Sequence, residues 1–392
     1  DMEAGSAGSR GGLALGSDNS DSSERINGNI SQSAGTSLLI SRLVVHQASG
    51  SEGVDLSNAG NEIDELGYTN RSGPLTIVDS AGGLTVVSSS TNGTLDNRLL
   101  LQTPGKLSLG SYGIAGAEVQ LIAGAGLASP GDIAIESTST ASYIRSTDGT
   151  GILVLNANGK SVDLDGRLWA DDANDRIILS NVHNAALGLT TANPFSGTIE
   201  LGQEALPTSV LSEVGGGTTG TIPLSGSDLW ETDKIVFPDS TLVTLTGTGD
   251  NSGLTFEITG TSSNGTELVD TVSGANDGTA VSNYYFDTIS EIEVIGGSTA
   301  GSLTIGNGRP ITGNVTQNSG NLEAQDLTGQ VDGSATLTNT NEIDEIEGFR
   351  ADLGFDLNNA HNLTVNGDIT AVDGGIRIAG TTSNDLTVAN GV

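Results

Sequence analysis

The sequence predicts an all-β chain, a right-handed parallel β-helix (solenoid) with a small inserted β-sandwich domain. Three observations predict it: a block of words that recurs about 280 residues later, short apolar-x-apolar strands at a period in the low twenties, and one stretch of longer alternating strands. The composition agrees, since the 392 residues include 57 Gly, 3% aromatic residues and no Cys. Such a chain must assemble its core from thin layers of Val, Ile, Leu and Ala.

The recurring block consists of three words in a fixed order. They are INGNISQSAG at 26–35 and ITGNVTQNSG at 311–320, NEIDEL at 61–66 and NEIDEI at 341–346, and the LTV triplets at 84–86 and 363–365. The three offsets between copies are nearly equal, which indicates a duplicated module. Because the second copy stops at Val392, we expect one full module plus the start of the next, cut from a longer protein.

A shorter period lies inside the module. Apolar-x-apolar strands begin at Ile133, Leu153, Ile177 and Ile199, at spacings of roughly 20–24 residues. Such a strand turns two side chains inward, and one coil alone cannot bury them, so the coils must stack. The Gly and Asn residues between strands supply the positive φ angles of tight corners. The structural alternative, an array of β-sandwiches, would show longer strands about every 8–12 residues.

One stretch, from about Ile222 to Gly308, has the pattern of a β-sandwich, because long alternating strands are joined there by turns such as DNSG. It also contains most of the aromatic residues in this part of the chain. We interpret it as a small β-sandwich with its own core. The expected organisation is an N-terminal extension at 1–25, coils of the first module at 26–221, the inserted β-sandwich at 222–308 and coils of the second module at 309–392.

The word order ITGNVTQNSG, NEIDEI, NNAHNLTVNGDITA and DLTVANG resembles the repeats of filamentous-haemagglutinin-like exoproteins and large autotransporter adhesins. The resemblance covers about residues 26–221 and 309–392. It implies secretion through an outer membrane, folding into a rod outside the cell, and a role in adhesion, biofilm structure or filament formation. It implies no catalytic residues. The stretch from about Leu242 to Gly306 is similar to small immunoglobulin-like modules of tailed-phage structural proteins and surface arrays.

Charge limits the partners. With 14 Lys and Arg against 48 Asp and Glu, the net charge is −34 and the pI is near 4.1, which repels phosphate backbones and anionic lipids. We therefore expect neither nucleic-acid binding nor membrane insertion, and no apolar run approaches the ~20 residues of a membrane span. The first residues, DMEA, do not resemble a signal peptide, so synthesis is expected to begin upstream of Asp1.

Carboxylate-rich turns are the candidate sites. The word DLDG contains Asp163 and Asp165 with one residue between them, and WADDANDR contains Asp171, Asp172 and Asp175. These five residues are candidate calcium ligands, since carboxylate oxygens suit Ca²⁺, although Asp is also an ordinary turn residue. Only three His residues occur, far apart in sequence, which argues against a Ser-His-Asp triad or a histidine metal site.

These features predict a non-enzymatic, extracellular structural or adhesive protein of a bacterial cell surface or filament, which requires no cofactor. The expected partners are further copies, through end-to-end association or continuation into further repeats, and host surfaces, abiotic surfaces or glycans. Two alternatives remain. One is a polysaccharide-degrading β-helix enzyme, which needs clustered carboxylates beside Arg or Lys. The other is a phage tail or virion fibre protein.

Overall fold

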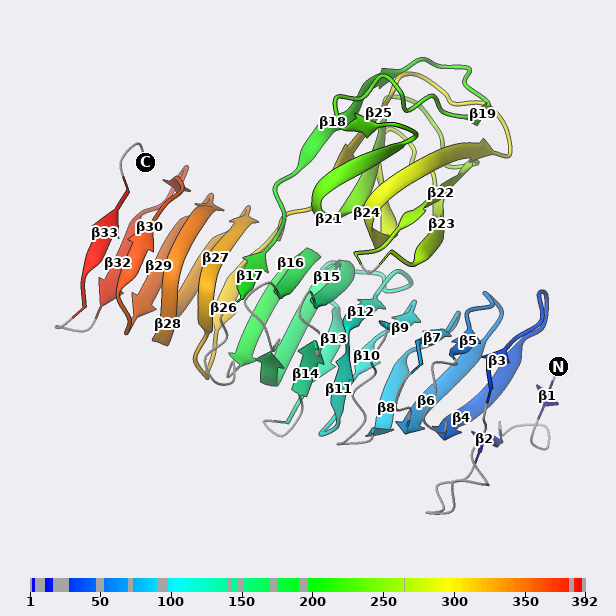
Figure 1. Ribbon diagram of the computed structural model, residues 1–392, viewed down its shortest axis with the longest axis horizontal. Coiled ribbons are helices and arrows are strands. Elements are labelled where there is room, and N and C mark those ends of the chain that lie inside the picture. The colour runs from blue at the N-terminus through cyan, green and yellow to red at the C-terminus, as the bar shows by residue number, and fades with distance from the viewer. Residues whose placement is uncertain are drawn as a thin grey trace. The chain divides into compact units, whose positions relative to one another are not determined.

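The chain divides into two compact units in the computed structural model (Figure 1). Residues 1–202 and 311–392 form a parallel β-solenoid of about 13 turns, and residues 203–310 form an antiparallel unit. The structure describes residues 2–3, 11–16, 28–46, 53–69, 73–89, 98–139, 143–146, 151–169, 175–189, 197–263, 265–380 and 384–389. All the regular elements in these residues are strands, which confirms the all-β fold with a parallel solenoid.

Each coil of the solenoid contributes strands to two main stacks, called face I and face II here. Face I contains β4 (Leu38–His46), β6 (Glu62–Thr69), β8 (Leu84–Ser89), β10 (Leu107–Ser108), β13 (Ile133–Ser137), the second halves of β15 (Ile152–Trp169) and β16 (Arg176–Leu189), β26 (Val315–Gln317), the first half of β28 (Ser334–Ala351), β29 (Gly354–Asn359) and β32 (Ile376–Gly380).

Face II runs beside it. It contains β3 (Ile30–Ser31), β5 (Val54–Leu56), β7 (Leu75–Val78), β9 (Arg98–Thr103), β12 (Glu118–Ala123), the first halves of β15 and β16, β17 (Thr198–Leu201), β27 (Glu323–Val331), the second half of β28, β30 (Leu363–Val365) and β33 (Leu386–Val388). Shorter strands complete some coils: β1 (Met2–Glu3), β2 (Gly12–Leu15), β11 (Gly113–Gly116), β14 (Tyr143–Ser146) and β31 (Ile369–Thr370).

An unbroken ladder of inward apolar side chains forms the core of face II. Its members are Ile30, Val54, Leu75, Leu99, Val119, Leu153, Ile177, Ile199, Leu327, Ile346, Val365 and Val388, each paired in register with the next. From Val54 to Val365 each is at most 5% exposed. Their spacing along the chain is close to twenty or in the low twenties, except for the longer coil from Val119 to Leu153 and the step across the antiparallel unit. This spacing agrees with the expected coil period.

The ladder crosses the insertion without interruption. Ile199 on β17 pairs with Leu327 on β27. When the inserted segment 203–310 is left out of the count, the coil between them has the ordinary length of about 20 residues. The backbone bonds also continue, since the N–H of Gly202 donates to Leu179 O (2.7 Å) and that of Gln330 donates to Gly202 O (2.9 Å). The antiparallel unit is therefore inserted into the chain of one coil while the stacking of the coils is kept.

One expected strand belongs to a different face. The sequence pattern groups the strand at Ile133 with the next one, at Leu153. In the structure β13 lies on face I, where Ile135 pairs with Leu107 and Val162, whereas Leu153 lies on face II. The spacing from Ile133 to Leu153 therefore separates a strand of face I from the next strand of face II, and it is not the length of one coil. Periodicity alone cannot separate two faces that carry the same apolar-x-apolar pattern.

The two copies of the duplicated module repeat each other's register. In the first, Glu65 and Leu66 on β6 pair with Thr85 and Val86 of the LTV strand. In the second, Glu345 and Ile346 on β28 pair with Thr364 and Val365 of the next LTV strand. Gly35 and Gly320, which end the first word in each copy, both adopt left-handed φ angles, 75° and 73°. The words therefore specify local backbone geometry as well as composition.

The two copies also share a buried polar clasp. Gln32 Nε2 donates to Asn61 Oδ1 (2.7 Å), and Asn61 Nδ2 donates back to Gln32 Oε1 (2.9 Å). The corresponding pair, Gln317 and Asn341, exchanges the same two bonds at 2.8 and 3.2 Å. Both asparagines are fully buried. Because buried amides must find partners, each clasp joins consecutive coils.

The copies lie on exchanged faces of the solenoid. The NEIDEL strand β6 stacks on face I, whereas the NEIDEI segment lies in the face II half of β28. The first words exchange in the opposite sense, since β3 is on face II and β26 is on face I. The same outward residues are therefore displayed on two different faces of the solenoid.

The antiparallel unit consists of β18 (Leu206–Val214), β19 (Gly220–Thr221), β20 (Trp230–Glu231), β21 (Lys234–Gly247), β22 (Thr255–Thr261), β23 (Glu267–Ser273), β24 (Thr279–Ile295) and β25 (Leu303–Asn307). The long β24 pairs with β21 along its first part and with β22 along its second. Phe256, Phe286 and Ile258 are among its core residues. The unit begins at Gln203 rather than at the expected residue 222, because β18 pairs with β25 and belongs to this sheet.

Candidate functional site

Three acidic side chains converge on the outside of face II. The carboxylate cluster comprises Asp326 on β27 with Glu345 and Glu347 on β28, and one oxygen from each lies within 4.8 Å of the others. Asp326 pairs in register with Glu345, one coil on. Between Leu327 and Thr328 the register shifts, so that Glu347 is an extra residue in β28. Bulges of this kind re-aim a side chain, and here the bulge supplies the third carboxylate.

Within the cluster, the pKa of Asp326 is raised. Partial burial, and then the nearby charges of Glu347 and Glu345, raise the pKa of Asp326 to about 6. The hydroxyl of Thr198 donates to Asp326 Oδ2 at 3.4 Å and opposes this pKa increase only in part. Such a group exchanges a proton near neutral pH. Three close carboxylates also form a donor set that suits a hard cation such as Ca²⁺.

The first module lacks this arrangement at the equivalent position. There Glu65, the counterpart of Glu345, pairs in register with Arg42, and Arg42 Nε lies 3.9 Å from Glu65 Oε2. In the second module an aspartate stands where the arginine was. One module therefore carries a solvated ion pair, and the other carries like charges within 4.8 Å of one another. Sequence reasoning missed this cluster, because Asp326 lies one coil away from its partners along the chain and only the coil register brings them together.

Two of the predicted calcium ligands do lie together. Asp163 and Asp165 are on β15, and Asp163 pairs in register with Glu136 of β13. Burial, followed by the charges of Asp165 and Glu136, raises the pKa of Asp163. Lys106 forms an ion pair with Glu136 and counteracts that pKa increase. The DLDG word thus lies on the surface of a strand of face I rather than in a calcium-binding loop.

Of the other three predicted ligands, only Asp175 lies in the described part of the chain, and it does not join Asp163 and Asp165. Asp171 and Asp172 lie outside the described residues. Asp175 is fully buried and accepts a hydrogen bond from the N–H of Gly151 (2.5 Å), so it stabilises a neighbouring coil. Among the described residues, the carboxylate cluster is the group of three that meets the geometry for joint metal ligation.

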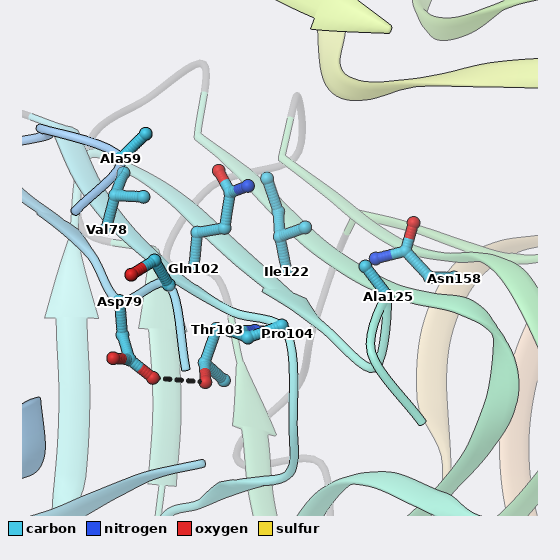
Figure 2. Close-up of a pocket in the computed structure, with 10 residues that line it drawn as sticks. Ala59, Val78, Asp79, Gln102, Thr103, Pro104, Ile122, Ala125 and Asn158 are labelled. Atoms are coloured by element: carbon cyan, nitrogen blue, oxygen red, sulfur yellow. Dashed lines mark hydrogen bonds between the residues drawn. The ribbon is translucent and has the colours of Figure 1, made fainter. Parts of the chain in front are cut away.

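A pocket of about 190 Å³ lies on the outside of face II in the first module (Figure 2). Val78, Gln102 and Ile122 pair in register across three strands and point to the same side in Figure 2. Further lining comes from Ala59, Asp79, Ser80, Thr103, Pro104, Ala125 and Asn158. Apolar side chains dominate the upper wall, and below them Thr103 Oγ1 donates to Asp79 Oδ2 (2.7 Å). The pocket suits a small uncharged group.

Comparison with known proteins adds no assignment, because no protein-family model, curated protein or solved structure matches the chain. None of the described residues forms a helix that could cross a membrane. The solenoid, its duplicated module and the surface features described above are therefore the features that bear on function.

Proposed function

We propose that the chain is a non-enzymatic structural or adhesive rod, exported to a bacterial cell surface or an extracellular filament. The observation that supports it most is the in-register ladder of face II, which continues past the insertion at 203–310 and includes strands of both modules. A solenoid gains length with each coil without needing a new core, so duplication of a module extends reach. The twelve stacked positions of the face II ladder, ~4.8 Å apart, span roughly 55 Å.

The surface chemistry is consistent with exposure outside a cell. A net charge of −34 opposes non-specific association between neighbouring copies of a long β-protein. The absence of Cys removes any dependence on disulfide formation during export. The partners that we propose are further coils at the ends of the rod and glycans or solid surfaces along its sides.

Imaging and binding measurements test the proposal together. Negative-stain images of the purified chain should show a solenoid of roughly 55 Å. Binding to a panel of glycans and abiotic surfaces should depend on residues of the outer faces. A compact particle without the elongated part would contradict the rod.

The carboxylate cluster favours a second candidate, a β-helix enzyme that cleaves polysaccharides. Pairs of carboxylates about 5 Å apart, one of them with a raised pKa, are the groups that glycoside hydrolases use. Asp326 and Glu345 meet both conditions. The test is release of reducing ends from neutral and acidic polysaccharides near pH 5. Activity that disappears in Asp326→Asn and Glu345→Gln would establish the enzyme and displace the rod.

A further inference from the structure

The pocket on the outside of face II contains a side-chain amide whose acceptor is unsatisfied. Gln102 lies on the middle one of three paired strands, with Val78 on one side and Ile122 on the other. Its Oε1 atom is buried and accepts no hydrogen bond from any part of the chain that the structure describes. A buried acceptor without a donor is unfavourable, because it has lost its water and gained nothing in exchange. A hydrogen-bond donor supplied by a ligand is therefore stabilising at this place.

A ligand can reach this amide with little movement of the protein. Gln102 is one of the residues that line the pocket. The last torsion of a glutamine side chain has a broad energy minimum, so a small rotation presents Oε1 to the space beside it. The pocket therefore offers a hydrogen-bond acceptor that is already held in place by the strand.

A second amide lies across the pocket from the first. Gln102 and Asn158 are on opposite sides of Ile122 in Figure 2. Asn158 Nδ2 donates one hydrogen to Ala123 O at 2.9 Å. Because an amide nitrogen carries two hydrogens, the other one can serve a ligand. The pocket thus pairs an acceptor on one side with a donor on the other.

Apolar side chains form the walls between these two amides. Val78 and Ile122 point outward from the sheet, yet they are only 9% and 1% exposed, so they line a recess. Ala59, Pro104 and Ala125 add further apolar lining. At about 190 Å³ the recess is smaller than the roughly 300–1,000 Å³ of pockets that enclose a drug-sized ligand. It therefore holds one substituent with an apolar end.

The pocket does not suit a charged ligand. None of the described residues that line it is Lys, Arg or His, and the whole chain carries −34, so anions are repelled. Both carboxylate oxygens of Asp79 already accept hydrogen bonds, Oδ1 from the N–H of Ile63 (3.1 Å) and Oδ2 from Thr103 Oγ1 (2.7 Å). Asp79 is thus occupied by the protein itself, and an uncharged group fits the remaining space best.

The second module shows that stacking of the coils does not require the apolar wall. Val78 corresponds to Asn358, because the residues that follow them, Asp79 and Asn359, lie at the same distance from the NEIDE word of their module. Asn358 Nδ2 donates to Thr338 O at 3.4 Å. β7 and β29 nevertheless both stack on the preceding coil. The apolar residue in the first module is therefore a property of the pocket rather than of the coil.

We propose that this pocket binds the acetamido group of an N-acetylated sugar. The N–H of that group donates to Gln102 Oε1, and its methyl group packs between Val78 and Ile122. The carbonyl oxygen points the opposite way in a trans amide and faces the second hydrogen of Asn158 Nδ2. The sugar ring stays outside the recess. This inference rests on the adhesive rod proposed above and names the chemical group that its side recognises.

Saturation-transfer NMR titrations of the full chain with three monosaccharides test the inference. N-acetylglucosamine, glucosamine and glucose differ only at C2. We expect a dissociation constant on the order of 1 mM for N-acetylglucosamine, since few atoms are buried, and at least ~tenfold weaker binding of the other two. The acetyl methyl group should receive the most saturation. Equal binding of glucose, tighter binding of glucosamine, or binding of N-acetyllysine without N-acetylglucosamine would overturn the inference.

Two variants locate the binding. Val78→Asn installs the residue of the second module, and Gln102→Leu removes the amide; each should weaken binding at least ~tenfold. The matched control, Asn358→Val, makes the reciprocal exchange outside the pocket and should bind as wild type does. Gln102→Leu replaces an unsatisfied acceptor with an apolar group, so its thermal midpoint should equal or exceed that of wild type.

Binding by Gln102→Leu that equals wild type would overturn the inference, whether or not Val78→Asn folds. Images of the same samples separate the pocket from the rod. Elongated particles that bind no N-acetylglucosamine would refute only the pocket, whereas compact particles would refute the rod whatever they bind.

Discussion

Asp79 and Asn359 occupy the same place in the two modules, each at the same distance along the chain from the NEIDE word of its own copy. Asp79 Oδ1 accepts a hydrogen bond from the N–H of Ile63 (3.1 Å), and Asn359 Oδ1 accepts one from the N–H of Ile343 (2.8 Å). Asp79 is 2% exposed and Asn359 1%. In both modules, therefore, the side chain at this position accepts a hydrogen bond from a buried N–H at the start of the NEIDE strand. The acceptor is a carboxylate in the first copy and an amide in the second.

Asp79→Asn should stabilise the solenoid at neutral pH. Burial raises the pKa of Asp79, with the hydrogen bond from Thr103 lowering it only in part. The folded state therefore favours the protonated acid. The stability contributed by this group is fully present below about pH 4, the pKa of an unfolded Asp, and is lost as the pH rises through the raised pKa. We expect a gain on the order of 1 kcal/mol at pH 7 and less at pH 4.

Thermal midpoints at the two pH values measure this effect. Asn359→Asp is the reciprocal control and should lower the midpoint at pH 7 more than at pH 4. An Asp79→Asn midpoint at pH 7 equal to or below that of wild type would contradict the argument.

Asn341→Ala should weaken the second module strongly. Asn341 Oδ1 accepts from the N–H of Leu322 (2.9 Å), and its Nδ2 donates to Leu337 O (2.9 Å) and to Gln317 (3.2 Å). Truncation leaves a buried donor and a buried acceptor without partners, at about 2–4 kcal/mol in total. Hydrogen exchange at the amides of β28 measures the loss. Asn358→Ala, which removes one 3.4 Å bond at the surface, is the control and should change exchange little.

Asp326→Arg should convert the carboxylate cluster into the ion pair of the first module, where Arg42 faces Glu65. In wild type the pKa of Asp326 is raised to about 6, so stability from this group is lost as the pH rises from about 4 to 6. An arginine at this position does not lose stability as the pH rises, and it would form an ion pair with Glu345. The expected gain at pH 7 is on the order of 1 kcal/mol, discounted for solvent screening.

Thermal melting from pH 4 to pH 8 tests this prediction, with Arg42→Asp as the reverse exchange. That variant should create a pH-dependent loss of stability in the first module. Equal pH profiles for wild type and Asp326→Arg would show that the cluster contributes no repulsion.

The fold could be predicted because the sequence patterns that specify it lie within short segments of the chain. The Gln32 and Asn61 clasp lies inside two recurring words, and the strand at Ile177 shows its inward pattern within three residues. The carboxylate cluster could not be predicted, because the contact of Asp326 with Glu345 depends on coil lengths and on the register shift in β28. The start of the antiparallel unit differs from the expected position for a similar reason. By its sequence alone, β18 resembles the short strands of the solenoid. Only its antiparallel pairing with β25 assigns it to the antiparallel unit.

The antiparallel unit should fold without the solenoid. Residues 203–310 have a hydrophobic core of their own, which includes Phe256 and Phe286. Expressed alone, this segment should unfold cooperatively and show a β-rich far-UV spectrum. A coil-like spectrum, or a broad transition without a clear midpoint, would argue that the unit needs the rest of the chain.

Excision of the antiparallel unit, joining Gly202 to Ile311, should in turn leave the solenoid folded. The ends of the insertion are close, since the N–H of Gln203 donates to Arg309 O at 2.8 Å. The shortened coil would match the length of the other coils, and the solenoid core includes no residue from 203–310. We therefore expect a β-rich far-UV spectrum and a thermal midpoint within a few degrees of wild type, a change of at most about 1 kcal/mol. A shortened chain that aggregates or loses its β spectrum would show that the insertion is needed to close the coil.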